Sequence, residues 1–401
     1  MELELVNRHW KEGFLYPYPK KRNLYIQLAQ SMEKRLITSL IGLRRTGKTT
    51  LLKQLINALI EKGIPSQDIL LYSFDEGEEL QTVMNEYLKI TSQDLGKKKL
   101  FFFFDEIQKL PNWQNKLKIY YDNYPNLKFV VSGSSSLFIR KKSESLAGRI
   151  QEFWLSPLSF NEFLLFREKT ELIKQQKLFA TQLTQELEIY SGKQFIEIIN
   201  ENKEFAETYL DTLLKKIIFE DISLVFPLEQ PQVLLKLFKI IASNPGMLID
   251  YHNLSSDLGI NEKTMSNYVY YLEMAFLVKK LYNYSKNQLT TEKKLKKIYP
   301  TVSSFCQTEM SKVIESLVVT QLNCQFFWKK THEVDCIFVK KNKLLPLEVK
   351  YSDTIKESEL KGLRKFMDEF NTNGIVLTKN LEKTEGKLQY VPTWKWLLQE
   401  Q

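Results

Sequence analysis

Eight consecutive residues combine the glycines, the lysine and the threonine that bind nucleotide phosphates. The stretch Gly42-Leu43-Arg44-Arg45-Thr46-Gly47-Lys48-Thr49 matches the pattern G-x-x-x-x-G-K-[ST] at every required position. Its glycines let the backbone curl so that N–H groups point at phosphate oxygens, while Lys48 would reach the β and γ phosphates and Thr49 would ligate Mg²⁺. We therefore predict an ATP and Mg²⁺ site formed by Gly42, Arg44, Arg45, Thr46, Gly47, Lys48, Thr49 and Thr50.

An acidic pair follows an apolar run further along the chain. Residues 100–104 are Leu-Phe-Phe-Phe-Phe, and Asp105 and Glu106 come next. A carboxylate at the tip of such a strand can bind Mg²⁺ when it faces the phosphate loop, and the following carboxylate can orient or deprotonate the attacking water. We assign the metal to Asp105, together with Thr49, and the water to Glu106.

Two further residues are candidates for catalysis. Ser132 opens the serine-rich stretch at residues 132–136, and its hydroxyl could contact the γ phosphate or the water. The alternative is a turn that caps the next helix. Arg149 is a candidate finger that stabilises charge on the transferred phosphate, in the same chain or in a neighbouring subunit, and the alternative is a surface arginine.

The last third of the chain contains a second group of charged residues. Glu348 and Lys350 are two positions apart, so on a strand they share one face, and Asp335 lies on the preceding apolar strand. Asp335 and Glu348 could hold Mg²⁺ while Lys350 lies beside the attacking water, and Glu315 precedes them on a predicted helix. The alternatives are a solvated strand face, or a core that keeps this shape without activity.

Alternating strands and helices must position the first site. Apolar runs predict strands at residues 36–41, 69–74, 100–104 and 127–131, and residues 50–59 have helical periodicity. Strands that alternate with helices indicate a doubly wound α/β domain with a parallel sheet, which binds ligands at the carboxyl ends of its strands. The phosphate loop and the acidic pair both follow strands of this kind.

Five motifs in order resemble one group of proteins. They are residues 42–50, Asp105-Glu106-Ile107-Gln108 with Pro111-Asn112-Trp113, residues 132–135, Leu146-Ala147-Gly148-Arg149, and Pro157-Leu158-Ser159-Phe160-Asn161-Glu162-Phe163. They resemble the bacterial and archaeal AAA-superfamily ATPases whose C-terminal domain of unknown function has a restriction-endonuclease-like core. The resemblance implies that Glu315, Asp335, Glu348 and Lys350 belong to a core of the PD-(D/E)xK nuclease type. The chain departs from this group between about residues 170 and 205.

Between these two regions we predict helices. Residues 160–226 are expected to form helices that close over the nucleotide edge, and helical patterns at 233–242, 253–258 and 261–272 resemble a winged helix-turn-helix. Lys293, Lys294, Lys296 and Lys297 could follow a DNA backbone, although many winged helices are spacers or protein contacts. The expected domains are an ATPase core (1–165), a helical lid (166–230), a winged helix-turn-helix (231–285) and a restriction-endonuclease-like α/β domain (286–401).

Composition restricts the remaining classes. The 401 residues are 43% hydrophobic, which suits packed cores, and the net charge of +9 is compatible with nucleic-acid contact without establishing it. No apolar stretch is long enough to cross a bilayer and no signal peptide is recognisable, so we expect a cytoplasmic protein without membrane contact. Three cysteines and three histidines without metal-ligand spacing predict reduced thiols and no zinc site.

Three functions fit these residues. The first is an ATP-hydrolysing regulatory or motor module that acts through the winged-helix and nuclease-like regions. The second is a Mg²⁺-dependent nuclease or DNA-binding protein, with double-stranded DNA as its partner, that ATP switches. The third is a signalling or defence scaffold in which ATP controls assembly with a protein partner or with further copies of the chain.

Overall fold

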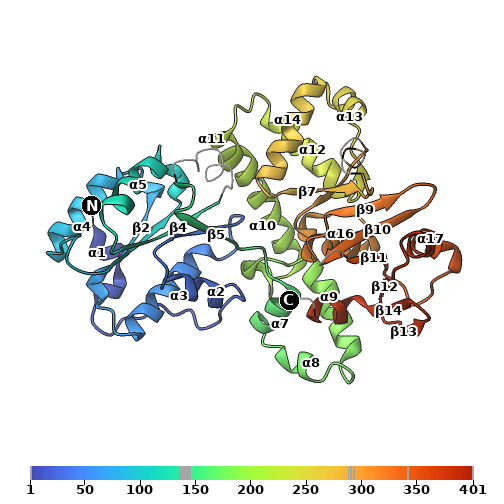
Figure 1. Cartoon of the computed structure of the whole chain (residues 1–401), viewed down its shortest axis with the longest axis horizontal. Helices are drawn as coiled ribbons and strands as arrows, with labels where there is room; N and C mark the ends of the chain where they lie inside the picture. The colour runs from blue at the N-terminus through green and yellow to red at the C-terminus, as the bar shows by residue number, and fades with distance from the viewer. Residues whose placement is uncertain are drawn as a thin grey trace. The chain divides into compact units, whose positions relative to one another are not determined.

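A computed structural model describes residues 2–134, 146–287, 289, 291, 294–340 and 343–399 (Figure 1). The chain forms two compact units, one up to Ser156 and one from Pro157 onwards. Each unit has its own sheet and its own buried core. Within the described residues, no helix is both long and apolar enough to cross a membrane.

The first unit is built on a five-stranded parallel sheet with the order β2-β3-β4-β1-β5. Its strands are β1 (Ile37–Ile41), β2 (Ile69–Ser73), β3 (Leu100–Asp105), β4 (Leu127–Gly133) and β5 (Ile150–Trp154). The four predicted strands and the doubly wound parallel sheet are confirmed. We did not predict β5, because polar Gln151 and Glu152 interrupt its apolar pattern and it lies at the edge of the sheet, where only one neighbour covers it.

Helices cover both faces of this sheet. They are α1 (Leu3–Val6), α2 (Tyr25–Ser31), α3 (Lys48–Glu61), α4 (Leu80–Thr91) and α5 (Trp113–Asn123). On one face, Leu51 and Leu55 of α3 pack with Leu40 and Phe103. On the other face, Phe102 stacks on Phe129 with ring centroids 5.4 Å apart, and Tyr87 of α4 contacts Phe102 edge-on at 5.5 Å. Burying a side chain of this size contributes about 1.5–3 kcal/mol, so the apolar strands anchor the loops at their ends.

The second unit contains a nine-stranded mixed sheet with the order β13-β14-β12-β11-β10-β9-β7-β8-β6. Its strands are β6 (Met247–Leu248), β7 (Val278–Asn283), β8 (Lys297–Pro300), β9 (Phe326–Lys329), β10 (Glu333–Lys340), β11 (Lys343–Lys350), β12 (Gly374–Thr378), β13 (Lys383–Glu385) and β14 (Leu388–Pro392). Strand β7 links two parts of this sheet: it pairs with β8 antiparallel up to Leu281 and with β9 parallel from Tyr282.

Helices flank the second sheet and also precede it in the chain. They are α7 (Phe160–Phe166), α8 (Thr170–Lys174), α9 (Ala180–Ser191), α10 (Lys203–Lys216), α11 (Ser223–Val225), α12 (Pro231–Ser243), α13 (Tyr251–Leu258), α14 (Glu262–Met274), α16 (Met310–Gln321), α17 (Lys361–Phe370) and α18 (Thr393–Gln399). The three predicted helical patterns between 233 and 272 are confirmed by α12, α13 and α14. Asn261 caps α14 by accepting the N–H of Thr264 at 2.8 Å, and Gly259 ends α13 with φ +66°.

Among the helices expected between residues 160 and 226, α7 and α9 contribute to the core of the second unit. Tyr190 of α9 packs on Phe160 and Phe163 of α7, with ring centroids 5.4 and 5.2 Å apart, in a cluster that also holds Leu317 of α16 and Trp394 of α18. Ser159 and Glu162 form a capping box that begins α7. Their expected position over the nucleotide edge stays a prediction.

Two of the three cysteines are joined, so the prediction of reduced thiols is wrong for Cys324 and Cys336. They form a disulfide with Cα atoms 6.1 Å apart. Cys324 lies just before β9 and Cys336 lies on β10, and the antiparallel pairing of these strands brings them together. Sequence spacing did not indicate this pairing, because it depends on the register of the two strands. Cys306 is free and partly buried.

Candidate functional site

The phosphate loop connects β1 to α3, and its two glycines are required by geometry. Gly47 has φ +95°, a left-handed conformation that side chains disfavour, and α3 begins at the next residue. A Cβ on Gly42 would lie 2.3 Å from the carbonyl oxygen of Leu155, so only glycine fits there. The first N–H groups of a helix have no acceptor within the helix and carry the positive end of its dipole. The loop therefore leads into an anion-binding helix end.

Lys48 lies across this loop and is only 5% exposed. Its Nζ donates to the carbonyl oxygens of Gly42 at 3.1 Å and Leu43 at 2.9 Å. The hydroxyl of Thr46 donates to the same Leu43 carbonyl at 2.8 Å. These contacts hold the ammonium group at the loop, where a phosphate oxygen could replace a carbonyl as its acceptor.

Asp105 is the centre of a set of hydrogen bonds at the strand ends. Its Oδ2 accepts from the hydroxyl of Thr49 and its Oδ1 from the hydroxyl of Ser132. The backbone N–H of Glu106 donates to Oδ1 at 3.0 Å. Because β4 lies between β1 and β3, the side chain at its carboxyl end can reach Asp105. The structure thus brings Thr49, Asp105 and Ser132 together, and the hydroxyl and carboxylate oxygens are ligands that suit Mg²⁺.

Glu106 follows Asp105 with φ +49°, a left-handed conformation that costs a non-glycine residue of the order of 1–3 kcal/mol. Such strain tends to occur at functional sites. Burial raises the pKa of Glu106, the charge of Lys48 opposes this increase, and the charge of Asp105 adds to it. A carboxylate with a raised pKa is a better proton acceptor near neutral pH, which suits a general base.

Gln108 is a site residue that we did not assign from the sequence. Its Nε2 donates to Glu106 Oε2 and, at 3.1 Å, to Ser134 Oγ, and its side chain is 4% exposed. A Cβ on Gly133 would lie 2.4 Å from its Oε1, so the end of β4 packs directly on this amide. Its position just after the acidic pair was the signal that could have identified it. Ser135 and Ser136 lie outside the described residues.

Arg22 is a second residue that we missed. It is 6% exposed, and its guanidinium donates to the carbonyl oxygens of Thr46 at 2.7 Å and Ser156 at 2.8 Å. It therefore braces the phosphate loop against the segment that follows β5. In the sequence, Arg22 ends an ordinary basic run, Lys20-Lys21-Arg22, and nothing there indicates this contact.

The other predicted binding residues surround the loop. Arg44 is partly buried, and Arg45 is exposed with φ +65°. Thr50 lies in the first turn of α3.

Arg149 is not brought to this loop within its own unit. It precedes β5, its carbonyl oxygen accepts the N–H of Ile37 at the start of β1, and its guanidinium Nε donates to Asp122 at 2.9 Å. Arg149 therefore lies where β1 and β5 begin, whereas the phosphate loop follows the carboxyl end of β1.

The second predicted constellation brings Asp335 and Glu348 together on β10 and β11. They are 8% and 5% exposed. The N–H of Val349 donates to Asp335 Oδ2 at 2.9 Å, and the N–H of Asp335 donates to Glu348 Oε2 at 3.4 Å. Lys350 donates to Glu348 Oε1 at 2.8 Å. Glu348 and Lys350 therefore lie on the same face of β11, as predicted, and they form a direct ion pair.

These buried carboxyls resist ionisation. Burial raises the pKa of Glu348 to about 8, and the charge of Asp335 adds to the increase while Lys350 opposes it. Burial also raises the pKa of Asp335, with a further increase from Glu315. For Lys350, burial lowers the pKa, but Glu348 and Asp335 outweigh burial and leave it raised. The pair is therefore stabilised by any cation that binds between its members.

The charge of Glu315 acts on Asp335, but the Glu315 carboxylate accepts hydrogen bonds from two other side chains. Its Oε1 accepts from Tyr299 Oη at 2.8 Å, and its Oε2 accepts from Lys312 Nζ at 2.8 Å. Among the described residues, no group of three or more His, Cys, Asp or Glu side chains is arranged to hold a metal. The predicted metal ligands at this second site therefore number two, Asp335 and Glu348.

The lysine run differs from our expectation at Lys297. This residue is 4% exposed, forms an ion pair with Glu333 and lies 4.0 Å from Glu315, so the prediction that it contacts a DNA backbone is wrong. All four residues of β8 are buried, and Lys297 Nζ lies 3.4 Å from the hydroxyl of Tyr299 on the same strand. Lys294 and Lys296 are partly buried. Lys293 lies outside the described residues.

Three family models match successive parts of the chain. Residues 34–164 match a family described as AAA domain. Residues 196–305 match a domain of unknown function (DUF8612), and residues 311–396 match another (DUF4143).

Similar proteins include two uncharacterized proteins of Methanocaldococcus jannaschii. One is 28% identical over 90% of this chain and 88% of its own length, and the other is 27% identical over 98% and 91%. An uncharacterized protein of Haemophilus influenzae is 29% identical over 66% of each chain.

Solved structures with some similarity include Orc1 of Aeropyrum pernix in complex with DNA and Hsp104 of S. cerevisiae in a casein complex. The first has a TM-score of 0.34 at 13% identity, covering 78% of this chain and 95% of that one. The second has a TM-score of 0.33 at 15% identity, covering 67% and 52%. Both TM-scores are low. The segment that matches the AAA family model contains the phosphate loop and Asp105, and the two matches to domains of unknown function lie within the second unit.

Proposed function

We propose that the first unit binds ATP with Mg²⁺ and hydrolyses it. The observation that carries this proposal is the contact between Thr49, which follows the phosphate loop lysine, and Asp105, which ends β3. These residues are 56 positions apart, and a chance loop match would not place a hydroxyl against a buried carboxylate at the carboxyl end of β3, two strands away in the sheet. The AAA family match supports the same function.

Each residue then has a separate role. Lys48 binds the β and γ phosphates, and Thr49 and Asp105 hold the metal. Mg²⁺, when bound with ATP, would offset the charge of the phosphate oxygens. Glu106 accepts the proton of the attacking water, and its raised pKa supports this role. Ser132 orients Asp105 through its hydroxyl. Arg149 would act only in a neighbouring subunit.

The second unit is the part through which the ATPase acts. The order α12, β6, α13, α14, β7, β8, with antiparallel pairing of β6 and β7 to β8, supports a winged helix-turn-helix. The succession of α16, three strands, α17 and β12 supports a restriction-endonuclease-like core. The division at about residues 165, 230 and 285 remains our proposal for the domain boundaries.

A second candidate function is supported by the Asp335, Glu348 and Lys350 contacts. Two buried carboxyls beside a lysine suit a metal-dependent nuclease that ATP switches. Assembly of an ATP-controlled scaffold is the third candidate, and the cytoplasm is the expected location for all three.

ATP turnover of the full chain, with and without double-stranded DNA, tests the first proposal. Lys48→Ala should abolish ATP binding, because it removes the cation at the phosphates. Glu106→Gln should bind ATP while turnover falls by about two to four orders of magnitude. Glu61→Gln, an exposed residue at the end of α3, is the matched control and should behave as wild type.

The outcomes separate the candidates. Turnover that DNA stimulates supports the module that acts on DNA, and DNA cleavage lost in Lys350→Ala supports the nuclease. Turnover indifferent to DNA favours the scaffold. Wild-type turnover by Glu106→Gln would refute its role as the base, and wild-type protein that binds no ATP in millimolar Mg²⁺ would refute the proposal as a whole.

A further inference from the structure

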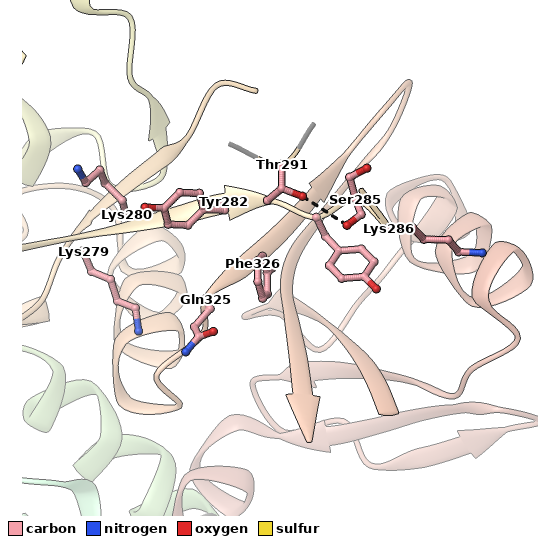
Figure 2. A pocket seen from close by; sticks show the side chains of 9 residues that line it. Lys279, Lys280, Tyr282, Ser285, Lys286, Thr291, Gln325 and Phe326 are labelled. Carbon is pink, nitrogen blue, oxygen red and sulfur yellow. Dashed lines mark hydrogen bonds between the residues drawn. The ribbon is translucent and has the colours of Figure 1, made fainter. Parts of the chain in front are cut away.

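A pocket of about 460 Å³ lies where β7 passes from β8 to β9 in the second unit (Figure 2). Its walls include Lys279, Lys280 and Tyr282 of β7, Tyr284 and Lys286 just beyond it, and Phe326 at the start of β9. The backbone N–H of Tyr282 donates to the carbonyl oxygen of Gln325 at 2.9 Å, which fixes the two strands together. The volume lies within the range of about 300–1,000 Å³ that is usual for small-ligand sites.

Aromatic rings form part of the wall. Tyr282, Tyr284 and Phe326 are only partly buried, although they belong to a sheet with a large core. Tyr284 contacts Phe326 edge-on, with ring centroids 5.7 Å apart, and a second ring, Phe370, at 5.6 Å. These contacts hold Phe326 and Tyr284 in place before any ligand arrives. Ordered aromatic faces at a pocket are suited to stacking with a planar ligand.

Ammonium groups flank these rings. In the view of Figure 2, Lys279 and Lys280 lie on one side of Phe326 and Lys286 on the other. Lys280 is paired with Glu273 at 2.6 Å, whereas among the described residues no carboxylate is paired with Lys279 or Lys286. Lys279 donates to the side-chain oxygen of Asn323, and burial lowers its pKa to about 8.

This combination selects the ligand chemistry. A partly desolvated ammonium with a neutral amide as partner gains from an anion, because the anion adds an attraction between opposite charges that the amide does not supply. A purely apolar ligand would cover the ammonium groups of Lys279 and Lys286 without giving either of them an anionic partner, which is costly. A ligand that joins a flat ring to a phosphate satisfies both features.

We propose that this pocket binds one nucleotide unit of a single-stranded nucleic acid, with its base on Tyr282 or Phe326 and its phosphate at Lys279. A free mononucleotide has the same chemistry and is the other source of such a unit. Duplex DNA is a poorer fit, because its bases are stacked on one another and offer no free face. The proposal concerns the second unit and does not rest on ATP hydrolysis by the first.

Fluorescence anisotropy of a labelled oligothymidylate of about 12 nucleotides, titrated with the full chain at low salt without ATP, tests this proposal. Wild type should bind. Tyr282→Ala should weaken binding about fivefold or more, because stacking on one ring is lost, whereas Tyr282→Phe should retain it. Lys279→Gln should weaken binding and reduce the salt slope by about 0.7 for the lost phosphate contact.

A second variant guards against misfolding. Gln325 is exposed at the pocket, so Gln325→Glu leaves the core intact and places a negative charge beside the phosphate; we expect several-fold weaker binding. Lys177→Gln, at an exposed lysine away from the pocket, should bind as wild type. Lys48→Ala should also bind the oligonucleotide normally, which excludes the phosphate loop as its site.

Competition distinguishes the two sources. If thymidine monophosphate displaces the oligonucleotide at comparable nucleotide concentration, the ligand is a free nucleotide; if only longer strands bind, it is a single-stranded nucleic acid. Wild type that binds neither probe overturns the proposal. So does an oligonucleotide affinity that stays unchanged in Tyr282→Ala, Lys279→Gln and Gln325→Glu.

Discussion

Replacing Gln108 by leucine should shift the pH dependence of ATP turnover. The side-chain amide of Gln108 donates to Glu106 Oε2 and to Ser134 Oγ, and this donation stabilises the ionised form of Glu106. Leucine has a similar size and donates no hydrogen bond. The Glu106 carboxylate would then lose a partner inside a buried site, so its pKa should rise further above the ordinary value.

The magnitude follows from the energy of the lost hydrogen bond. A hydrogen bond to a charged group contributes about 1.5–3 kcal/mol. Since one pKa unit corresponds to about 1.36 kcal/mol, the acidic limb of the turnover profile should move up by about one to two pH units. The sign is fixed because Glu106 must be ionised to accept a proton, and a higher pKa requires a higher pH for the same ionised fraction.

Steady-state ATP turnover measured between about pH 5 and pH 9 checks this prediction. Gln81→Leu, at an exposed position of α4, is the control and should keep the wild-type profile. Turnover reduced equally at all pH values, with an unmoved acidic limb, would mean that Gln108 only packs against Gly133. That result would refute the argument that Gln108 tunes the base.

Three further predictions follow from other contacts. Gly42→Ala would place a Cβ 2.3 Å from the Leu155 carbonyl oxygen, so we expect the loop to shift. The affinity for ATP measured by calorimetry should fall, and the free energy of unfolding should drop by about 1–3 kcal/mol. An unchanged affinity would show that the loop tolerates the shift. The pKa of Glu348 is about 8 in the folded state against 4.5 in the unfolded state, so the folded state binds more protons between these values. The free energy of unfolding should therefore fall by a few kcal/mol as the pH rises from 4.5 to 8. Chemical denaturation of Glu348→Gln should lack this fall, and an identical fall in the variant would assign it to another group. Reducing the disulfide of Cys324 and Cys336, which are 12 residues apart, should cost about 3 kcal/mol and lower the melting temperature, and a melting temperature that dithiothreitol leaves unchanged would contradict this.

Much of the first site could be predicted because its chemistry is local in the sequence. Residues 42–49 are consecutive, so the strand, the loop and the start of α3 are specified together by glycines and apolar spacing. Asp105 lies at the carboxyl end of an apolar strand. In a parallel sheet the carboxyl ends of all strands lie on the same side, so Asp105 was expected near the phosphate loop. The helix patterns of α12, α13 and α14 were recognisable for the same reason: periodicity and capping residues act within a few positions.

The contacts that complete the sites are not local, and the tertiary structure decided them. Arg22 reaches Thr46, 24 residues away, only because the lead-in segment folds back on the loop. Gln108 contacts Ser134 because β3 and β4 are neighbours in the sheet. Arg149 lies at the end of the sheet away from the phosphate loop, because β5 begins beside the start of β1 and runs parallel to it.

In the second unit, too, the partners of charged residues and of cysteines could not be predicted from the sequence. In the sequence Lys297 belongs to an ordinary basic run, yet its side chain is buried beside Glu333 and Glu315, which lie far along the chain. Cys324 and Cys336 meet because β9 and β10 pair in one register. The sequence determined four strands of the first sheet, the helices α12, α13 and α14 and the phosphate-binding turn, because short-range sterics and hydrophobic periodicity depend on adjacent residues. Strand order and register join residues that are far apart in the chain, so these partners emerged only when the sheets had formed.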